Sequence, residues 1–212
     1  DLLSLPDDYL PRTNYVPACS PDEYRARTPK VSWVEEGESQ PKRVTEYYRF
    51  VNREMVGTSS ERTLMTTIIP KESAHINTCL ASVFKDREKL LDFFGMTLSI
   101  ALDFRVKTTG MGHINTSLLN QLPILTNTNY QPYIHSRALL LTCITIHYSD
   151  LWQSTWNSAF TQQRWSIAPH SDHPGAQVLP QDFFQNLTPE WQRHNALRSD
   201  YARRQALVEI DV

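Results

Sequence analysis

Two runs of strand-forming residues between Tyr47 and Pro70 constrain the fold more than any other feature of this sequence. The small polar stretch GTSSE joins the runs, and Pro70 ends the second one because proline cannot donate to a sheet ladder. Successive strand side chains point to opposite faces, so one row of each strand is expected to face a core. The expected core row contains Tyr48, Phe50, Leu64, Thr66 and Ile68. The sequence therefore predicts an antiparallel hairpin with one buried face.

Three arginines, Arg49, Arg53 and Arg62, stand among the apolar residues of this hairpin. They can lie on the solvated face of a half-buried sheet. Alternatively they can face phosphates or base edges of a nucleic acid, which a guanidinium group binds through two parallel hydrogen bonds. The hairpin alone favours the solvated face. For Arg62 a further interpretation is an ion pair with the adjacent Glu61 that shapes the turn.

The clearest helical pattern lies in residues 85–107, where apolar residues recur at spacings of three and four, as one buried helix face requires. These residues are Leu90, Leu91, Phe94, Leu98, Ala101 and Leu102. Glycines in the stretch TTGMG are expected to end the helix. A shorter helical turn follows and closes at Pro123. The pattern predicts a single helix over residues 85–107.

Further helices are expected in the C-terminal part of the chain. Residues 135–165 predict one long helix or two, with a broad apolar and aromatic face. Thr188, Pro189 and Glu190 predict the start of a terminal helix, because they supply a capping hydroxyl, a first-turn proline and a carboxylate near the positive end of the helix dipole. This helix is expected to continue to the end of the chain.

The remaining segments are less regular. Residues 1–43 are rich in proline and predict an ordered but irregular arm, whereas residues 73–84 fit either a strand or a short helix. The predicted fold class is α+β. An irregular N-terminal arm and a small antiparallel sheet with packed helices occupy residues 1–130, and a helical part occupies residues 131–212. The two parts are expected to form one compact unit, excised from a larger protein.

Composition narrows the class of protein. No apolar run approaches the roughly 18 residues that span a bilayer, so no membrane partner is expected. The 3 cysteines are far apart, which argues against a disulfide framework and indicates a reducing cytoplasm. The net charge of -2 is unlike the strongly basic domains typical of nucleic-acid binders, but most of the basic residues are arginines, which suit phosphate and guanine.

Motifs of familiar enzyme classes are missing from the sequence. There is no GxSxG nucleophile elbow, and TTGMGH lacks the remaining glycine and lysine of a phosphate loop. His170 and His173 have the spacing of two metal ligands, but no third ligand stands nearby. Cys143 is expected to be an inert thiol on the inner face of a helix. We therefore expect no catalytic, cofactor-binding or metal-binding residue in this chain.

Four segments together carry a resemblance to a known family. They are YYRFVNREMVGTSSERTLMTTIIPKESAHI, DFRVKTTGMGHINTSLLNQLPIL, SRALLLTCITIHYSDLW and RSDYARRQALVEID. In this order they resemble the C-terminal target-recognition region of large adenine-N6 DNA methyltransferases, the single-chain enzymes of type IIG restriction-modification and of BREX and DISARM phage defence. The matching motif residues are Arg53, Glu54, Glu61, Arg62, Thr63 and Pro70, then Lys107, Gly110, Asn115, Gln121, Leu122 and Pro123, then Arg198, Arg204, Glu209 and Asp211.

The resemblance implies a specificity domain that recognises double-stranded DNA for a separate catalytic methyltransferase domain of the parent protein. S-adenosylmethionine would be a cofactor of that parent enzyme only. This chain has no Pro-Pro pair, so it lacks the tetrapeptide with which the family holds the target adenine. DNA contacts are expected from Arg49, Arg53, Arg62, Arg105, Lys107, His113 and Asn115.

Two alternatives to this interpretation stay open. For the loop after residue 107, Gly110 can simply end one helix while Asn115 caps the next. For the whole chain, the rival function is a protein-interaction module whose helical part docks another subunit, since aromatic residues such as Trp152, Trp156 and Trp165 are favoured in interface cores.

Overall fold

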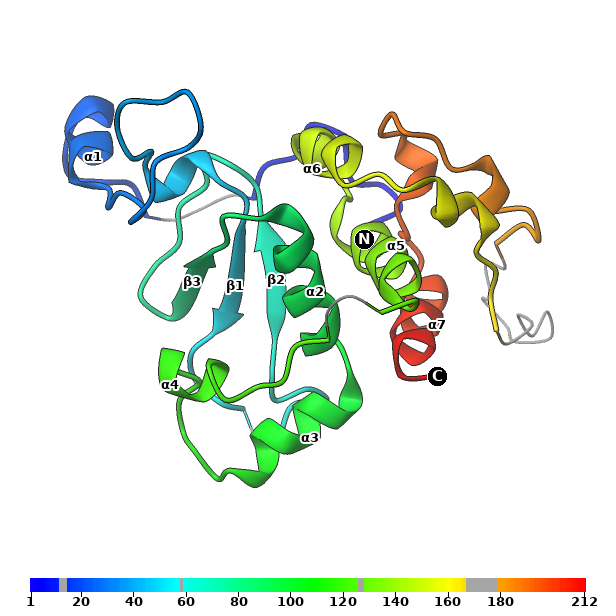
Figure 1. Cartoon of the computed structure of the whole chain (residues 1–212). Helices are drawn as coiled ribbons and strands as arrows, with labels where there is room; N and C mark the ends of the chain where they lie inside the picture. The colour runs from blue at the N-terminus through cyan, green and yellow to red at the C-terminus, as the bar shows by residue number, and fades with distance from the viewer. Residues whose placement is uncertain (12–14, 58, 126–127, 167–178) are drawn as a thin grey trace.

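The chain folds as an α+β protein, as the sequence predicts (Figure 1). The structure is a computed structural model that describes residues 1–11, 15–57, 59–125, 128–166 and 179–212. Figure 1 shows the sheet in one half of the molecule with helix α2 across it, and a group of helices with α5, α6 and α7 in the other half. Within the described ranges, no helix has both the length and the apolar character needed to cross a bilayer.

The sheet has three strands, and β1 (Arg49–Arg53) lies at its centre between β2 (Thr66–Ile69) and β3 (Cys79–Val83). Both neighbours run antiparallel to β1. The predicted hairpin of β1 and β2 is therefore confirmed. The ambiguous residues 73–84 contain a strand rather than a helix.

The predicted core row of the hairpin is buried, with one exception. Tyr48, Phe50, Leu64 and Ile68 are at most 5% exposed. Thr66 is only half-buried, and its hydroxyl shares a hydrogen bond of 2.9 Å with the hydroxyl of Thr97. β1 is buried on both faces, because Arg49 and Val51 are buried as well. A hairpin pattern cannot reveal this, since a third strand decides which strand becomes central.

Residues 85–107 form two helices, α2 (Arg87–Thr97) and α3 (Ile100–Thr108), so the prediction of a single helix is wrong. The chain breaks at Ser99, whose backbone is extended and whose hydroxyl oxygen accepts a 3.1 Å hydrogen bond from the amide of Ala101. Of the predicted helix face, Leu90, Leu91, Phe94 and Leu102 are buried, Leu98 is half-buried and Ala101 is exposed. The break therefore turns α3 out of the line of α2.

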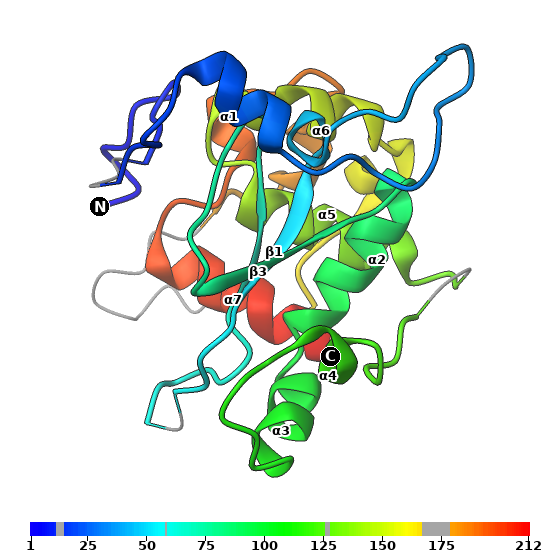
Figure 2. The same ribbon diagram turned by 90° about the vertical axis from the view of Figure 1, so that its left-hand side faces the viewer.

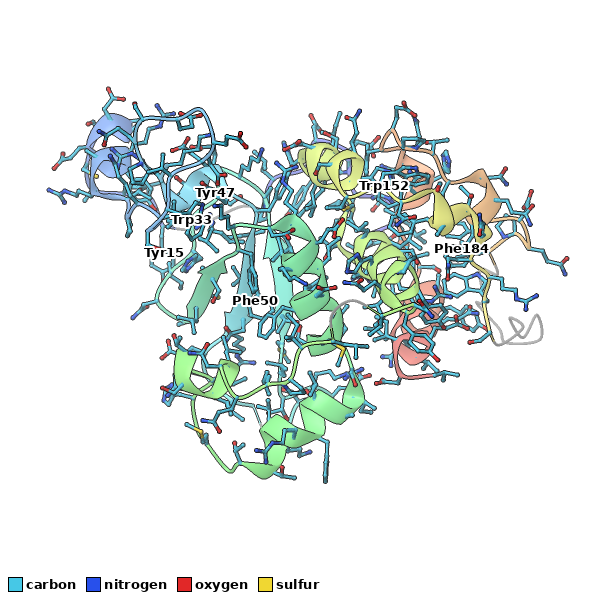
Figure 3. All side chains as sticks on the ribbon, in the orientation of Figure 1. Tyr15, Trp33, Tyr47, Phe50, Trp152 and Phe184 are labelled. Carbon is cyan, nitrogen blue, oxygen red and sulfur yellow. The ribbon has the colours of Figure 1, made fainter. Side chains whose placement is uncertain are left out.

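α5 (Gln131–Thr142) joins the two halves of the molecule, since it packs against α2 on one side and α7 (Asp200–Asp211) on the other. Its approach to α2 is close, because a Cβ added to Gly95 would lie 2.3 Å from Cγ2 of Ile134. One hydrophobic core runs through both halves from Phe50 to Trp152 and Phe184 (Figure 3).

Shorter elements complete the fold. The α-helices are α4 (Thr116–Leu119) and α6 (Ser149–Ser154), and the 3-10 turns are Val44–Glu46, Ile146–Tyr148, Ser158–Gln162, Phe184–Asn186 and Arg193–Asn195. α4 is the helical turn predicted before Pro123. Residues 135–165 contain α6 and most of α5, so the alternative with two helices is the correct one.

Two segments differ from the prediction. The arm in residues 1–43 is irregular except for helix α1 (Pro21–Arg27), which Ser20 caps by accepting a 3.2 Å hydrogen bond from the amide of Glu23. The terminal helix α7 begins twelve residues after Thr188, the predicted cap, and is capped by Ser199 instead. The Thr188 carbonyl accepts a 2.9 Å hydrogen bond from the indole of Trp152, so tertiary contacts hold this segment outside a helix.

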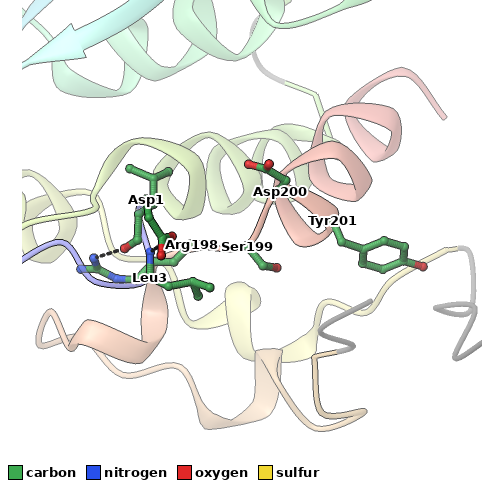
Figure 4. A pocket seen from close by; sticks show the side chains of 7 residues that line it. Asp1, Leu3, Arg198, Ser199, Asp200 and Tyr201 are labelled. Carbon is green, nitrogen blue, oxygen red and sulfur yellow. Dashed lines mark hydrogen bonds between the residues drawn. The ribbon is translucent and has the colours of Figure 1, made fainter. Parts of the chain in front are cut away.

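The start of the chain lies against the C-terminal half, and Arg198 holds it there. Its guanidinium donates to the carbonyl of Leu2 at 3.0 Å and to the carbonyl of Ile144 at 2.5 Å. Figure 4 shows the surface pocket of about 570 Å³ that lies beside these bonds. Asp1, Leu2, Leu3, Arg198, Ser199, Asp200 and Tyr201 line it. Two nitrogens of Arg198 bind backbone carbonyls, so this residue fixes the N-terminal arm to the C-terminal half.

Candidate nucleic-acid interface

The loop after α3 is fixed to the chain that leaves β1. The amide of Ile114 donates to the carbonyl of Glu54 at 2.7 Å, and the amide of Val56 donates to the carbonyl of Gly112 at 3.0 Å. The buried side chain of Asn52 donates to the carbonyl of Ile114 at 3.2 Å. These bonds continue the pairing of β1 beyond its end, so the glycine-containing loop has a defined position.

The returning arm of the hairpin is fixed to α3 by one carboxylate. Oδ1 of Asp103 accepts hydrogen bonds from the backbone amides of Thr63 and Leu64, both at 2.7 Å. All three residues are buried. A buried carboxylate that accepts two amide bonds forms a strong and directional contact. The hairpin loop, α3 and the loop after it are therefore held together at one end of the molecule, the lower end in Figure 2.

Five of the predicted DNA-binding residues belong to these three segments: Arg53, Arg62, Arg105, Lys107 and His113. We call them the basic surface. Arg62 is half-buried, and the other four are exposed. Residues far apart in the sequence are thus brought to the same end of the fold. The sequence identified the residues one by one, but their convergence depends on the bonds of Asp103 and Asn52.

Two carboxylates lie in the same segments as the basic surface. Oε1 of Glu54 is 3.8 Å from Nδ1 of His113, which makes an ion pair when the imidazole is protonated. Glu61 binds Arg204 of α7 through contacts of 2.8 and 3.3 Å, and this hydrogen bonding raises the pKa of Arg204. The proposed ion pair between Glu61 and Arg62 is therefore wrong. Arg62 makes no hydrogen bond or ion pair within the described part of the chain, so its guanidinium is available.

Arg49 lies outside the basic surface, at the opposite end of β1. Its side chain is buried, its Nη2 donates to the carbonyl of Ser73, and burial lowers its pKa. Neither interpretation offered by the sequence fits, since this guanidinium meets neither solvent nor a nucleic acid. The reason is that β1 is central, so side chains of both neighbouring strands flank Arg49, and the turn that carries Ser73 covers its guanidinium. Arg49 is a core residue that holds the turn after β2.

The structural alternative for the loop after residue 107 is confirmed. Gly110 has a φ of 66° just after α3, a conformation that glycine adopts without strain and that commonly ends helices. Oδ1 of Asn115 accepts a 3.0 Å hydrogen bond from the amide of Leu118 and so caps α4. Asn115 is exposed, and its amide nitrogen faces no partner among the described residues. Its first role is to start a helix.

The motif residues of the terminal helix have structural roles as well. Glu209 is fully buried, and its Oε2 lies 2.8 Å from Nη2 of Arg137, which is also fully buried. Oδ1 of Asp211 accepts a 2.5 Å bond from the Ser99 hydroxyl and a 3.1 Å bond from the amide of Ile100. Asp211 therefore caps α3 from the far end of the sequence. These motif residues build the scaffold that carries the basic surface.

The outward face of α3 carries residues that the sequence analysis did not single out. Phe104 is 65% exposed and Ile100 is 60% exposed, whereas Leu102 and Val106 are buried on the inward side. The signal was present in the sequence, because residues at spacings of three and four from one another share a helix face. Residues 100, 104 and 107 form such a set, opposite to the core face.

The tryptophans that motivated the rival docking function lie inside the fold. Trp152 is fully buried, and Trp156 and Trp165 are half-buried. Trp165 stacks on Phe183 with ring centroids 6.2 Å apart, and Trp156 packs against Phe160 edge-on at 5.4 Å. These rings pack in or against the core of the C-terminal half.

The described residues contain no group of three His, Cys, Asp or Glu side chains that could hold a metal ion. His170 and His173 lie outside the described residues. Cys143 is buried, and burial raises the pKa of its thiol, as expected for an inert core cysteine. Comparison with protein families, with curated proteins and with solved structures found no match to this chain.

Proposed function

We propose that this chain recognises double-stranded DNA through the basic surface and serves as the specificity domain of an adenine-N6 DNA methyltransferase. The observation that carries the proposal is the convergence of Arg53, Arg62, Arg105, Lys107 and His113 at one end of the fold. A duplex offers phosphates that fix register and base edges that carry sequence information. Arginine and lysine on rigid segments suit both kinds of contact.

The position of each residue of the basic surface indicates which part of the duplex it contacts. Arg105 and Lys107 are exposed on the last turns of α3, where a cation can reach phosphates. Arg53 and Arg62 leave and enter the hairpin loop, where a flat guanidinium can reach a guanine edge in the major groove. The bonds of Asp103 and Asn52 keep these segments in a fixed relation, which lowers the entropy lost on binding.

The methyl-transfer reaction belongs to the catalytic domain of the parent enzyme in this proposal. That domain would bind S-adenosylmethionine and the target adenine, since the chain itself lacks the tetrapeptide for the adenine. A restriction-modification or phage-defence enzyme of this kind acts in the cytoplasm. The near-neutral charge of the chain fits a recognition domain whose parent supplies further phosphate contacts.

Fluorescence anisotropy with a labelled mixed-sequence duplex tests the proposal. Binding should weaken steeply between about 50 and 200 mM salt, because each neutralised phosphate releases condensed counterions. The double variant Arg105→Ala/Lys107→Ala should lower the salt slope by about 2 units. The matched control is Arg25→Ala/Arg27→Ala on α1, an exposed pair at the other end of the molecule in Figure 2. Equal salt slopes for the two double variants would reject the basic surface as the DNA site.

A further inference from the structure

α3 exposes large apolar side chains beside its cations. Phe104 is 65% exposed and Ile100 is 60% exposed, one turn apart on the same side of the helix. The helix does not need them for its core contact, which Leu102 and Val106 provide. Clusters of exposed apolar side chains on a soluble protein mark binding sites more often than chance.

The charges around Phe104 indicate what covers it. Arg105 follows it directly and Lys107 lies one turn further, and neither forms an ion pair within the described residues. An acidic or purely apolar protein surface would match only half of this arrangement. A nucleic acid matches both halves, because it presents phosphates on its outside and flat apolar bases inside.

The helix that carries Phe104 is anchored at several points. The carboxylate of Asp211 and the hydroxyl of Ser99 cap its start, Asp103 ties its middle to the hairpin, and Gly110 ends it. A side chain that pushes into a base stack must resist the force of unstacking. A helix fixed at its start and middle can transmit that force, whereas a mobile loop would yield.

We propose that Phe104, supported by Ile100, inserts as an apolar wedge between neighbouring base pairs and bends the duplex. The wedge rests on the proposed function, since it requires that DNA binds at the basic surface. Apolar wedges in other DNA-binding proteins unstack a base step and bend the duplex by roughly 20 to 90°. Lys107 and Arg105 would hold the flanking phosphates while the step opens.

The test measures binding and bending together. A short duplex with a donor dye at one end and an acceptor at the other is titrated with the 212-residue chain. The wild-type chain should raise energy transfer, and Phe104→Ala should lose most of this rise while binding falls by roughly 5- to 150-fold. Phe104→Leu should keep most of the rise, because leucine also wedges. Lys107→Ala should keep the bend but lower the salt slope by about one unit.

The control is Tyr9→Ala, which removes an exposed aromatic ring from the arm near His147. If the wild-type chain binds without bending, or if Phe104→Ala bends DNA like the wild type, the wedge is wrong. The proposed function then rests on the salt slope alone. If no salt-dependent binding is seen at all, the proposed function fails and the wedge fails with it. Equal melting temperatures of all variants ensure that folding is not the cause.

Discussion

Replacing Asp103 with alanine should loosen the candidate DNA interface and destabilise the fold. The carboxylate accepts two backbone bonds of 2.7 Å from Thr63 and Leu64 in a buried site. Alanine leaves two buried amides without a partner, and each unsatisfied group costs about 1–3 kcal/mol. The free energy of unfolding should therefore fall by about 2–6 kcal/mol, a large share of the total stability of a domain. Asp103→Asn keeps an acceptor oxygen without the charge, so it should cost clearly less.

Urea unfolding gives the change in stability, and amide hydrogen exchange shows where it arises. In Asp103→Ala the amides of Thr63 and Leu64 should lose protection, while Phe50 in the centre of β1 should exchange only with global unfolding. DNA affinity should fall as well, because the hairpin loop and α3 no longer keep a fixed relation. A change in unfolding free energy below about 0.5 kcal/mol, with both amides still protected, would refute the reasoning.

Three further outcomes are expected. Glu209→Ala should lower the free energy of unfolding in urea by about 3–5 kcal/mol, because it leaves the buried guanidinium of Arg137 without a countercharge. A loss near zero would show that the pair is not desolvated. Cys143 should react with a thiol reagent only as fast as the protein unfolds, because burial raises its pKa, and rapid labelling of the folded chain would contradict its placement. Asn115→Ala should cost about 0.5–2 kcal/mol of stability, whereas Asn115→Ser should keep the cap of α4. A loss of DNA affinity in the serine variant would therefore show that the side-chain amide of Asn115 contacts DNA.

The period of the apolar residues predicted the hairpin correctly, and also its core row except for the half-buried Thr66. The alternation of Tyr48 and Phe50 with their neighbours depends only on strand geometry, which is local. The burial of Arg49 was missed because it depends on β3, which pairs with the other edge of β1. The residues of the hairpin carry no signal for this third strand.

The helix boundaries also depend on residues that are distant in the sequence. Residues 85–107 have one continuous apolar pattern, yet the helix breaks at Ser99, where Asp211 supplies a cap from 112 residues away. Thr188 and Ser199 carry similar local signals for a helix start, a capping hydroxyl followed by a carboxylate in the first turn. The indole of Trp152 binds the carbonyl of Thr188, so the helix starts at the other site.

The candidate site was predictable in its parts but not as a surface. Arg53, Lys107 and His113 were identified singly, whereas the bonds that bring their segments together come from Asp103 and Asn52, which carried no recognised motif. Phe104 could not be found in this way, because the apolar pattern that predicts a helix reports its core face and Phe104 lies on the opposite face.

Hydrogen exchange of the chain with and without duplex DNA tests the central claim most directly. DNA bound at the basic surface should slow exchange in residues 53–64 and 99–115, and should leave α1 (Pro21–Arg27) unchanged as the internal control. Protection should disappear as salt rises from about 50 to 200 mM, because the contacts are to phosphates. Protection confined to α5 and α6 would contradict the account. So would an absence of protection at low salt, measured at concentrations of protein and duplex that give an anisotropy change.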